Sequence, residues 1–252
     1  MKSFVLMLAV TLGAASAVCV AEPPFVNSVV SNDLRFILDT DPNAQVSFRF
    51  VERGRREMPD KRTEKLSAEA YVFEAAYRAE ENAKHTVQIS ANRDFGSRAK
   101  AAAYARKLAR AIGLQPELFR NVLRHVVLHN GDETAFAEER GGFFVIYSEN
   151  MDDRIGTNDL QHTVFHECAH VALEKEHAAS AGWVAAQDAD GGFVTEYARD
   201  NPVKEDVPES AIFAYALLNY PGRLATEVEA AVREAMPNRL AYFAAIEGFV
   251  AP

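Results

Sequence analysis

Apolar and polar residues alternate in several stretches of the first half of the chain, as they do in strands with one buried face. Val46, Phe48 and Phe50 show this alternation most clearly. The pattern predicts strands at residues 45–51, 70–77, 85–91, 124–128 and 142–147. We expect the second and third to pair through the polar turn 80–82. The Ala and Glu content of the second stretch leaves a helix as the alternative there.

Apolar residues recur at helical spacing farther along the chain. The clearest case ends at Gly113, after apolar residues at positions 101, 104, 105, 108, 109 and 112. The sequence predicts helices at 97–112, 116–123, 158–176, 208–220, 223–235 and 239–249. Strands mostly precede helices, so the expected fold class is α+β, with a small mixed sheet and a helical C-terminal part.

The N-terminus has the layout of a secretory signal peptide. Lys2 precedes an apolar run over residues 4–12, and small residues follow at 13–17. This run is too short to span a bilayer, and cleavage could follow Ala17 or Ala21. We therefore expect a secreted or periplasmic protein that is not attached to a membrane after signal cleavage.

Cysteine use is compatible with this export. Cleavage after Ala21 leaves Cys168 as the remaining cysteine, so no intramolecular disulfide can form. A lipid anchor on Cys19 is the alternative, and it is disfavoured by the bulky Val18 before it. We divide the chain into a signal peptide (1–21), an irregular N-terminal region (22–66) and a main domain (67–252).

Composition and charge limit the classes of molecule that this protein is expected to bind. The 252 residues include 48% apolar and 25% charged residues, as in ordinary globular proteins. With 27 basic and 36 acidic side chains the net charge is −9, and the basic residues are scattered apart from a run over 53–62. Nucleic acid is not expected as a ligand, because phosphate binding needs a clustered cationic face.

The chemistry-bearing motif is His166-Glu167-Cys168-Ala169-His170, an HExxH sequence inside the helix predicted over 158–176. Histidines four apart on a helix share one face and can reach one Zn²⁺ ion. Glu167 can then act as general base toward a water on that ion. Cys168 should point away from the pair, as a small residue of the core.

Two further histidines lie near the motif without the spacing of a ligand. His162 and His170 are about 12 Å apart along a helix, so they cannot join His166 on one tetrahedral ion. We expect His162 on the surface or beside the metal ligands. His177 is one residue too late for the HExxHxxGxxH pattern, and Leu173 replaces its glycine.

The third ligand must come from downstream acids, because a catalytic zinc takes three protein ligands and one open position. Glu196 with Asp200 imitates the ligand helix of thermolysin-like enzymes but lacks the preceding Asn. Glu205 and Glu209 lie four apart across the start of a helix. Glu205 is the preferred ligand, with Glu209 supporting a ligand histidine by hydrogen bonding. The alternative is that neither acid binds a metal, and that both only interact favourably with the positive N-terminal end of the helix dipole.

The segment 195–201, followed by Glu205 and Glu209, resembles the region after HExxH in the catalytic domain of anthrax lethal factor and related exported bacterial zincins. The resemblance covers roughly residues 120–220. It implies a zincin-like fold with a sheet packed on the HExxH helix, zinc ligands His166, His170 and Glu205, general base Glu167, and Tyr197 as the hydroxyl that stabilises an oxyanion. It also implies that strand 142–147 is the sheet edge that pairs with a peptide. One extra residue between Tyr197 and Glu205 departs from the pattern.

Two functions follow as hypotheses. The first is an exported zinc metallopeptidase that hydrolyses bonds of a peptide or protein substrate. The alternative is a non-catalytic zincin-like binding module with a structural zinc. Glu167 favours the enzyme, since a binding module does not need a carboxylate at that position. The sequence does not indicate the substrate or the oligomeric state.

Overall fold

The computed structural model describes residues 21–28, 34–79, 83–138 and 141–250. Most of the expected signal peptide, Cys19 and the turn 80–82 lie outside these residues. None of the described helices is long and apolar enough to cross a membrane.

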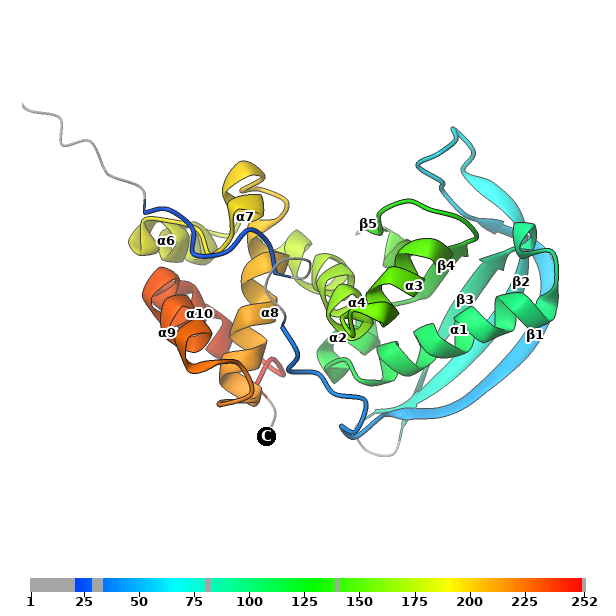
Figure 1. Cartoon of the computed structure of the whole chain (residues 1–252), viewed down its shortest axis with the longest axis horizontal. Helices are drawn as coiled ribbons and strands as arrows, with labels where there is room; N and C mark the ends of the chain where they lie inside the picture. Colours follow the sequence, from blue (N-terminus) through cyan, green and yellow to red (C-terminus); the bar gives the residue numbers. More distant parts are fainter. Residues whose placement is uncertain (1–20, 29–33, 80–82, 139–140, 251–252) are drawn as a thin grey trace, which may run out of the picture.

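A six-stranded mixed sheet forms one side of the molecule (Figure 1). Its strands are β1 (Gln45–Glu57), β2 (Ser67–Arg78), β3 (Lys84–Asn92), β4 (His125–His129), β5 (Phe136–Glu138) and β6 (Phe143–Tyr147). Their order is β1-β2-β3-β4-β6-β5. The first three strands are antiparallel, β3, β4 and β6 run parallel, and β5 is antiparallel to β6. Together with the helices of the C-terminal half, this sheet confirms the α+β class.

The second strand confirms the alternation read from the sequence and removes the helix alternative. Tyr71, Phe73 and Tyr77 face the main core, whereas Ala70 and Val72 face a smaller core on the other side of the sheet. β1 runs six residues beyond its predicted end and pairs with β2 along its length. The suggested boundary at residue 66 therefore falls between two paired strands.

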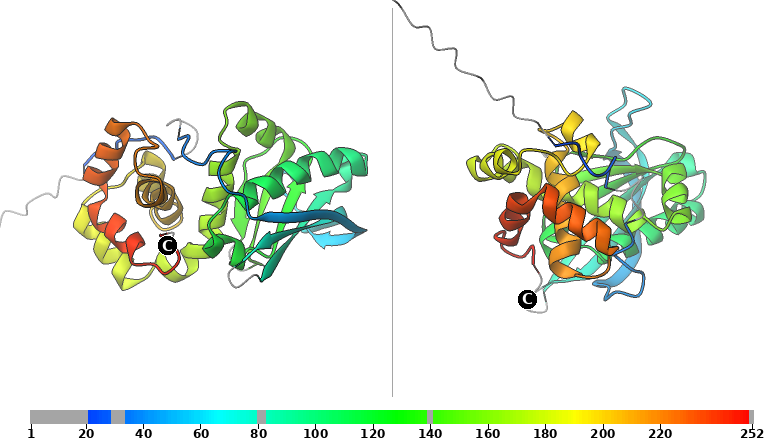
Figure 2. Two further views of the ribbon diagram at one scale, coloured as in Figure 1. Left: turned by 90° about the horizontal axis from the view of Figure 1, so that it is seen from below. Right: turned by 60° about the vertical axis from the view of Figure 1, so that its left-hand side comes forward.

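Helices pack on the sheet and form most of the C-terminal half (Figure 2). They are α1 (Arg98–Gly113), α2 (Glu117–Val122), α3 (Ser148–Gly156), α4 (Leu160–Ala169), α5 (Lys175–His177), α6 (Ala181–Asp190), α7 (Glu196–Asp200), α8 (Asp206–Asn219), α9 (Thr226–Ala235) and α10 (Pro237–Ala244). Helix α1 crosses β1, β2 and β3, and α4 lies between the sheet and α8. Helix α10 packs against α6, α8 and α9.

The helix predicted over 158–176 contains a change of winding. Helix α4 ends at Ala169, a π-helical turn (η4) covers His170–Glu174, and α5 continues from Lys175. Single π-helical turns within helices often occur at functional sites. Here the change begins at the second histidine of the motif.

A buried ion network fixes the start of α8. The guanidinium of Arg239 is fully buried and pairs with Asp190, at 2.9 Å, and with Asp206. Asp206 also accepts hydrogen bonds from Gln187 and Ser210. Because Asp206 directly follows Glu205, this network determines where the candidate ligand lies.

The N-terminal segment 21–28 lies beside the segment that leads into α7 (Figure 1). Backbone amides of Glu196 and Tyr197 donate to the carbonyls of Phe25 and Val26 at 2.8 and 3.0 Å. Residues more than 160 positions apart are thus held together, which brings residue 28 to the start of α8.

Candidate metal centre

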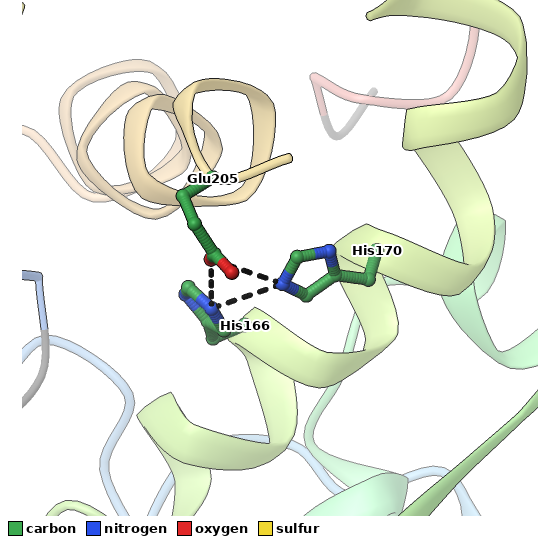
Figure 3. Close-up of side chains that lie close together, drawn as sticks. All are labelled: His166, His170 and Glu205. Carbon is green, nitrogen blue, oxygen red and sulfur yellow. Dashed lines mark hydrogen bonds and ion pairs between the residues drawn. The ribbon is translucent and has the colours of Figure 1, made fainter. Parts of the chain in front are cut away.

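Two helices bring three possible metal ligands together. His166 lies on α4, His170 begins the π-helical turn, and Glu205 is the residue before the first turn of α8. One ligand atom of each lies within 4.8 Å of the others, and they form the one such group found among the described residues. Figure 3 shows the two imidazoles and the carboxylate facing a common point. The structure therefore places together the three residues expected from the sequence.

The spacing of these atoms fits a small tetrahedral ion. His166 Nε2 and His170 Nε2 are 3.2 Å apart, and Glu205 Oε2 lies 3.3 and 3.2 Å from them. Zinc bonds of about 2.0–2.1 Å at tetrahedral angles place ligand atoms about 3.3 Å apart. Glu205 Oε2 is buried and has no aligned hydrogen bond in the described part of the chain. Three possible ligand atoms converge here, an arrangement that positive charge stabilises.

Each histidine has a carboxylate behind it. His170 Nδ1 lies 2.6 Å from Glu174 Oε2, and His166 Nδ1 lies 3.2 Å from Glu209 Oε1. The second contact is at ion-pair distance but is not aligned as a hydrogen bond. A carboxylate at Nδ1 favours the proton on that nitrogen and leaves the Nε2 lone pair toward the metal. Glu209 thus lies beside His166 without the hydrogen bond expected from the sequence, and Glu174 contacts His170 directly.

Glu209 is itself held by the N-terminal segment. The Ser28 hydroxyl donates to Glu209 Oε1 at 2.5 Å, and the Ser28 amide donates to Oε2 at 2.8 Å. Both residues are buried. Two donors on one carboxylate fix its rotamer, so its orientation toward His166 depends on a residue 181 positions away.

The electrostatics of the cluster favour positive charge. Burial lowers the pKa of His170, but Glu174 and Glu205 raise it more, to about 9. Burial also lowers the pKa of His166, and Glu205 with Glu209 raises it well above its usual value. Burial raises the pKa of Glu205, but both histidines lower it far more. A divalent cation bound here would replace the protons that these groups otherwise hold.

Glu167 and Tyr197 border two cavities beside the ligand cluster. One cavity, of about 340 Å³, also contains Arg154, and we call it the Arg154 cavity. The other, of about 360 Å³, also contains Glu174, and we call it the Glu174 cavity. Both are lined by His166 and by Lys61 from the β1–β2 connection.

The two predicted catalytic groups differ in their environment. Burial raises the pKa of Glu167, and its Oε2 has no hydrogen-bond partner among the described residues. The Tyr197 hydroxyl donates to Glu205 Oε1 at 3.1 Å, and burial followed by Glu205 raises its pKa far above the usual range. Tyr197 is therefore a proton donor at neutral pH, next to one candidate ligand.

The strand beside the site differs from the expectation. The stretch read as 142–147 is β6, which is internal in the sheet because β4 pairs with one side and β5 with the other. The edge is β5, whose three residues also line the Glu174 cavity. The sequence did not reveal β5, because three residues are too few to show an alternation.

The remaining candidates lie away from the cluster. His162 is fully buried and its Nε2 accepts from the amides of Phe36 and Ile37, so the surface position expected for it is wrong. His177 Nδ1 contacts the Tyr242 hydroxyl at 2.7 Å. Glu196 is exposed in the first turn of α7. Cys168 is buried in the core, as predicted.

Sequence reasoning missed Ser28, Glu174 and Lys61. Glu174 could have been found, because it lies four residues after His170. The other two are brought to the site only by the fold. Comparisons with protein-family models, with curated proteins and with solved structures found no match. The geometry of the site is therefore the basis on which we infer the function.

Proposed function

We propose that this protein is an exported zinc metallopeptidase of the zincin type. The observation that carries the proposal is the convergence of His166, His170 and Glu205 at tetrahedral spacing, with Glu167 bordering the same cavities. His166, His170 and Glu205 would hold the ion. Zinc bound there supplies a Lewis acid and activates water at neutral pH.

The roles of the other side chains follow from their surroundings. Glu167 is buried and lines both cavities, so its carboxylate can take a proton from water and pass it to the departing amine. Its raised pKa brings the carboxyl nearer to neutral pH, which suits a group that both accepts and donates. Tyr197 has a protonated hydroxyl that can move from Glu205 to the carbonyl oxygen on which charge develops.

The position of β5 supports a peptide as substrate. This short strand pairs with β6 on one side only, and its residues face the cavity that contains both histidines. An extended peptide can add to such an edge through backbone hydrogen bonds. Its scissile bond would then lie beside Glu167.

Three variants test the proposal. Glu167→Gln should retain about one zinc per chain and lose peptide hydrolysis, because only the proton-accepting oxygen is changed. Glu205→Ala should lose zinc in the presence of a chelator, because two ligands remain. Glu196→Ala removes an exposed acid from the neighbouring helix and should keep both properties.

The rival hypothesis, a binding module with a structural zinc, predicts a different pattern. Under this hypothesis the parent protein binds zinc but hydrolyses no peptide. The Glu167→Gln variant then behaves like the parent in both respects. Absence of transition metal after zinc reconstitution would contradict both hypotheses.

A further inference from the structure

The two cavities beside the ligand cluster differ in charge, although they share Lys61, His166, Glu167 and Tyr197. The cationic and acidic side chains of the Arg154 cavity are Lys61, Arg154, Glu167 and Glu209. Those of the Glu174 cavity are Lys61, Lys204, Glu138, Glu167, Glu174 and Glu205. The first set therefore balances and the second has two more acids than cations. The Arg154 cavity is therefore the less acidic of the two.

This less acidic cavity lies in an acidic protein. The chain has a net charge of −9, so a cationic substrate would be attracted to most of the surface without discrimination. A cation without a carboxylate partner beside the site selects instead for a negative group on the ligand.

Lys61 is the central cation. Its Nζ donates to Thr134 Oγ1 at 3.1 Å and to the Ala135 carbonyl at 3.4 Å, and it lies 4.7 Å from the centre of the Phe136 ring. These partners are neutral, and no ion pair of Lys61 is present in the described ranges. Its charge also acts on Glu167. An ammonium group thus borders the site without a carboxylate partner.

Arg154 adds a donor on the wall of the same cavity. Arg154 Nη1 pairs with Asp159 at 3.2 Å, whereas its Nε is buried with no partner in the described structure. Buried polar atoms without partners are uncommon in folded proteins, and they mark places where a ligand or water completes the hydrogen bonding.

We propose that the Arg154 cavity is a subsite for a carboxylate of the peptide substrate, with Lys61 as its principal cation. This inference rests on the proposed peptidase function and names its substrate class. The peptide would carry the carboxylate on the side of the scissile bond that lies toward Arg154. The group is either an Asp or Glu side chain or a free C-terminus.

A degenerate peptide library tests the subsite, in one form with amidated C-termini and one with free C-termini. Parent protein loaded with zinc should cleave peptides with Asp or Glu enriched at one fixed position, and cleavage in the amidated form identifies a side chain as the source. Enrichment confined to the free-acid form and to bonds near the C-terminus identifies the terminal carboxylate. Cleavage without either preference overturns the proposal.

Variants of Lys61 separate charge recognition from packing. Lys61→Met keeps the stem beside Phe136 and should lower kcat/KM for the preferred acidic peptide roughly 10- to 100-fold. The preference, measured as the ratio of kcat/KM for this peptide to that for the same peptide with Gln in place of the acid, should fall by a similar factor. Lys61→Arg should restore most of the acidic preference. Equal losses on both peptides would show that Lys61 only tethers β5, and would overturn the proposal.

Lys65→Met is the matched control, because Lys65 lies in the same connection but outside both cavities. It should leave the preference unchanged.

A binding measurement separates failure of the subsite from failure of the peptidase. Zinc-loaded Glu167→Gln protein is immobilised, and the peptides it retains are compared with those retained by the Glu167→Gln/Lys61→Met double variant. Acidic enrichment that is lost in the double variant supports the subsite even if the parent cleaves nothing. Retention without acidic enrichment, or no retention, contradicts it.

Discussion

Ser28 and Glu209 are 181 residues apart in the chain, and the Ser28 hydroxyl donates a 2.5 Å hydrogen bond to Glu209 Oε1 inside the protein. The same oxygen lies 3.2 Å from His166 Nδ1. The N-terminal segment is therefore connected to a candidate metal ligand through one carboxylate. Partners of this kind orient ligand histidines and raise their basicity.

This relationship predicts that Ser28→Ala weakens zinc binding about tenfold, which is within the usual effect of changing a residue behind a metal ligand. Zinc affinity is measured by competition with a chromophoric chelator. Ser90→Ala is the control, because Ser90 is also a buried serine but its hydroxyl has no partner in the described structure. Equal zinc affinity in Ser28→Ala and the parent would show that Glu209 needs no support from Ser28.

A second prediction concerns Tyr197. Tyr197→Phe should retain zinc and its melting temperature and lose roughly 100-fold in kcat, the scale of one removed oxyanion donor. Its hydroxyl contacts Glu205 but is not one of the clustered ligand atoms. A loss expressed in zinc content, with kcat per bound zinc unchanged, would assign the hydroxyl to holding Glu205.

The buried network of Arg239 predicts a large effect on stability. Arg239→Met leaves Asp190 and Asp206 buried without their cation, which should lower the free energy of unfolding by about 3–5 kcal/mol. Urea denaturation measures this change. Arg199→Met is the comparison, because Arg199 forms exposed ion pairs with Glu22 and Asp200 and its loss should change stability little. Similar effects of both variants would contradict this account.

His162 predicts the direction of a pH dependence. Burial lowers its pKa from the usual 6.5 to about 4, so the unfolded chain binds more protons than the folded one between these values. The contribution of His162 to the free energy of unfolding is fully present above pH 6.5. It decreases as the pH falls toward 4, by roughly 3 kcal/mol in total. Unfolding free energies of the parent and of His162→Gln across this range measure it. The variant should show the shallower slope, and parallel slopes would refute the assignment.

The spacing of apolar residues predicted the strands and helices that show a complete apolar pattern within their own sequence. The β2 strand was found because Tyr71, Phe73 and Tyr77 alternate toward the main core. Helix α1 was found because its apolar stripe is complete and Gly113 ends it. Helix α6 was missed, because its burial comes mainly from Trp183 and Ala186 rather than from a full stripe.

The candidate ligands were read from the sequence because HExxH spacing depends on local helix geometry alone. Glu205 was chosen over Glu196 through resemblance and position relative to the next helix. Ser28 and Lys61 could not be predicted from the sequence. Their contacts with the site depend on how the fold arranges the N-terminal segment and the β1–β2 connection.

The most direct measurement of the central claim is an anomalous difference map from crystals of the zinc-reconstituted protein, recorded on both sides of the zinc absorption edge. The account predicts one peak per chain, bound by His166 Nε2, His170 Nε2 and a carboxylate oxygen of Glu205, with Glu167 beside it. No peak at this cluster, or a peak held by other side chains, would contradict it.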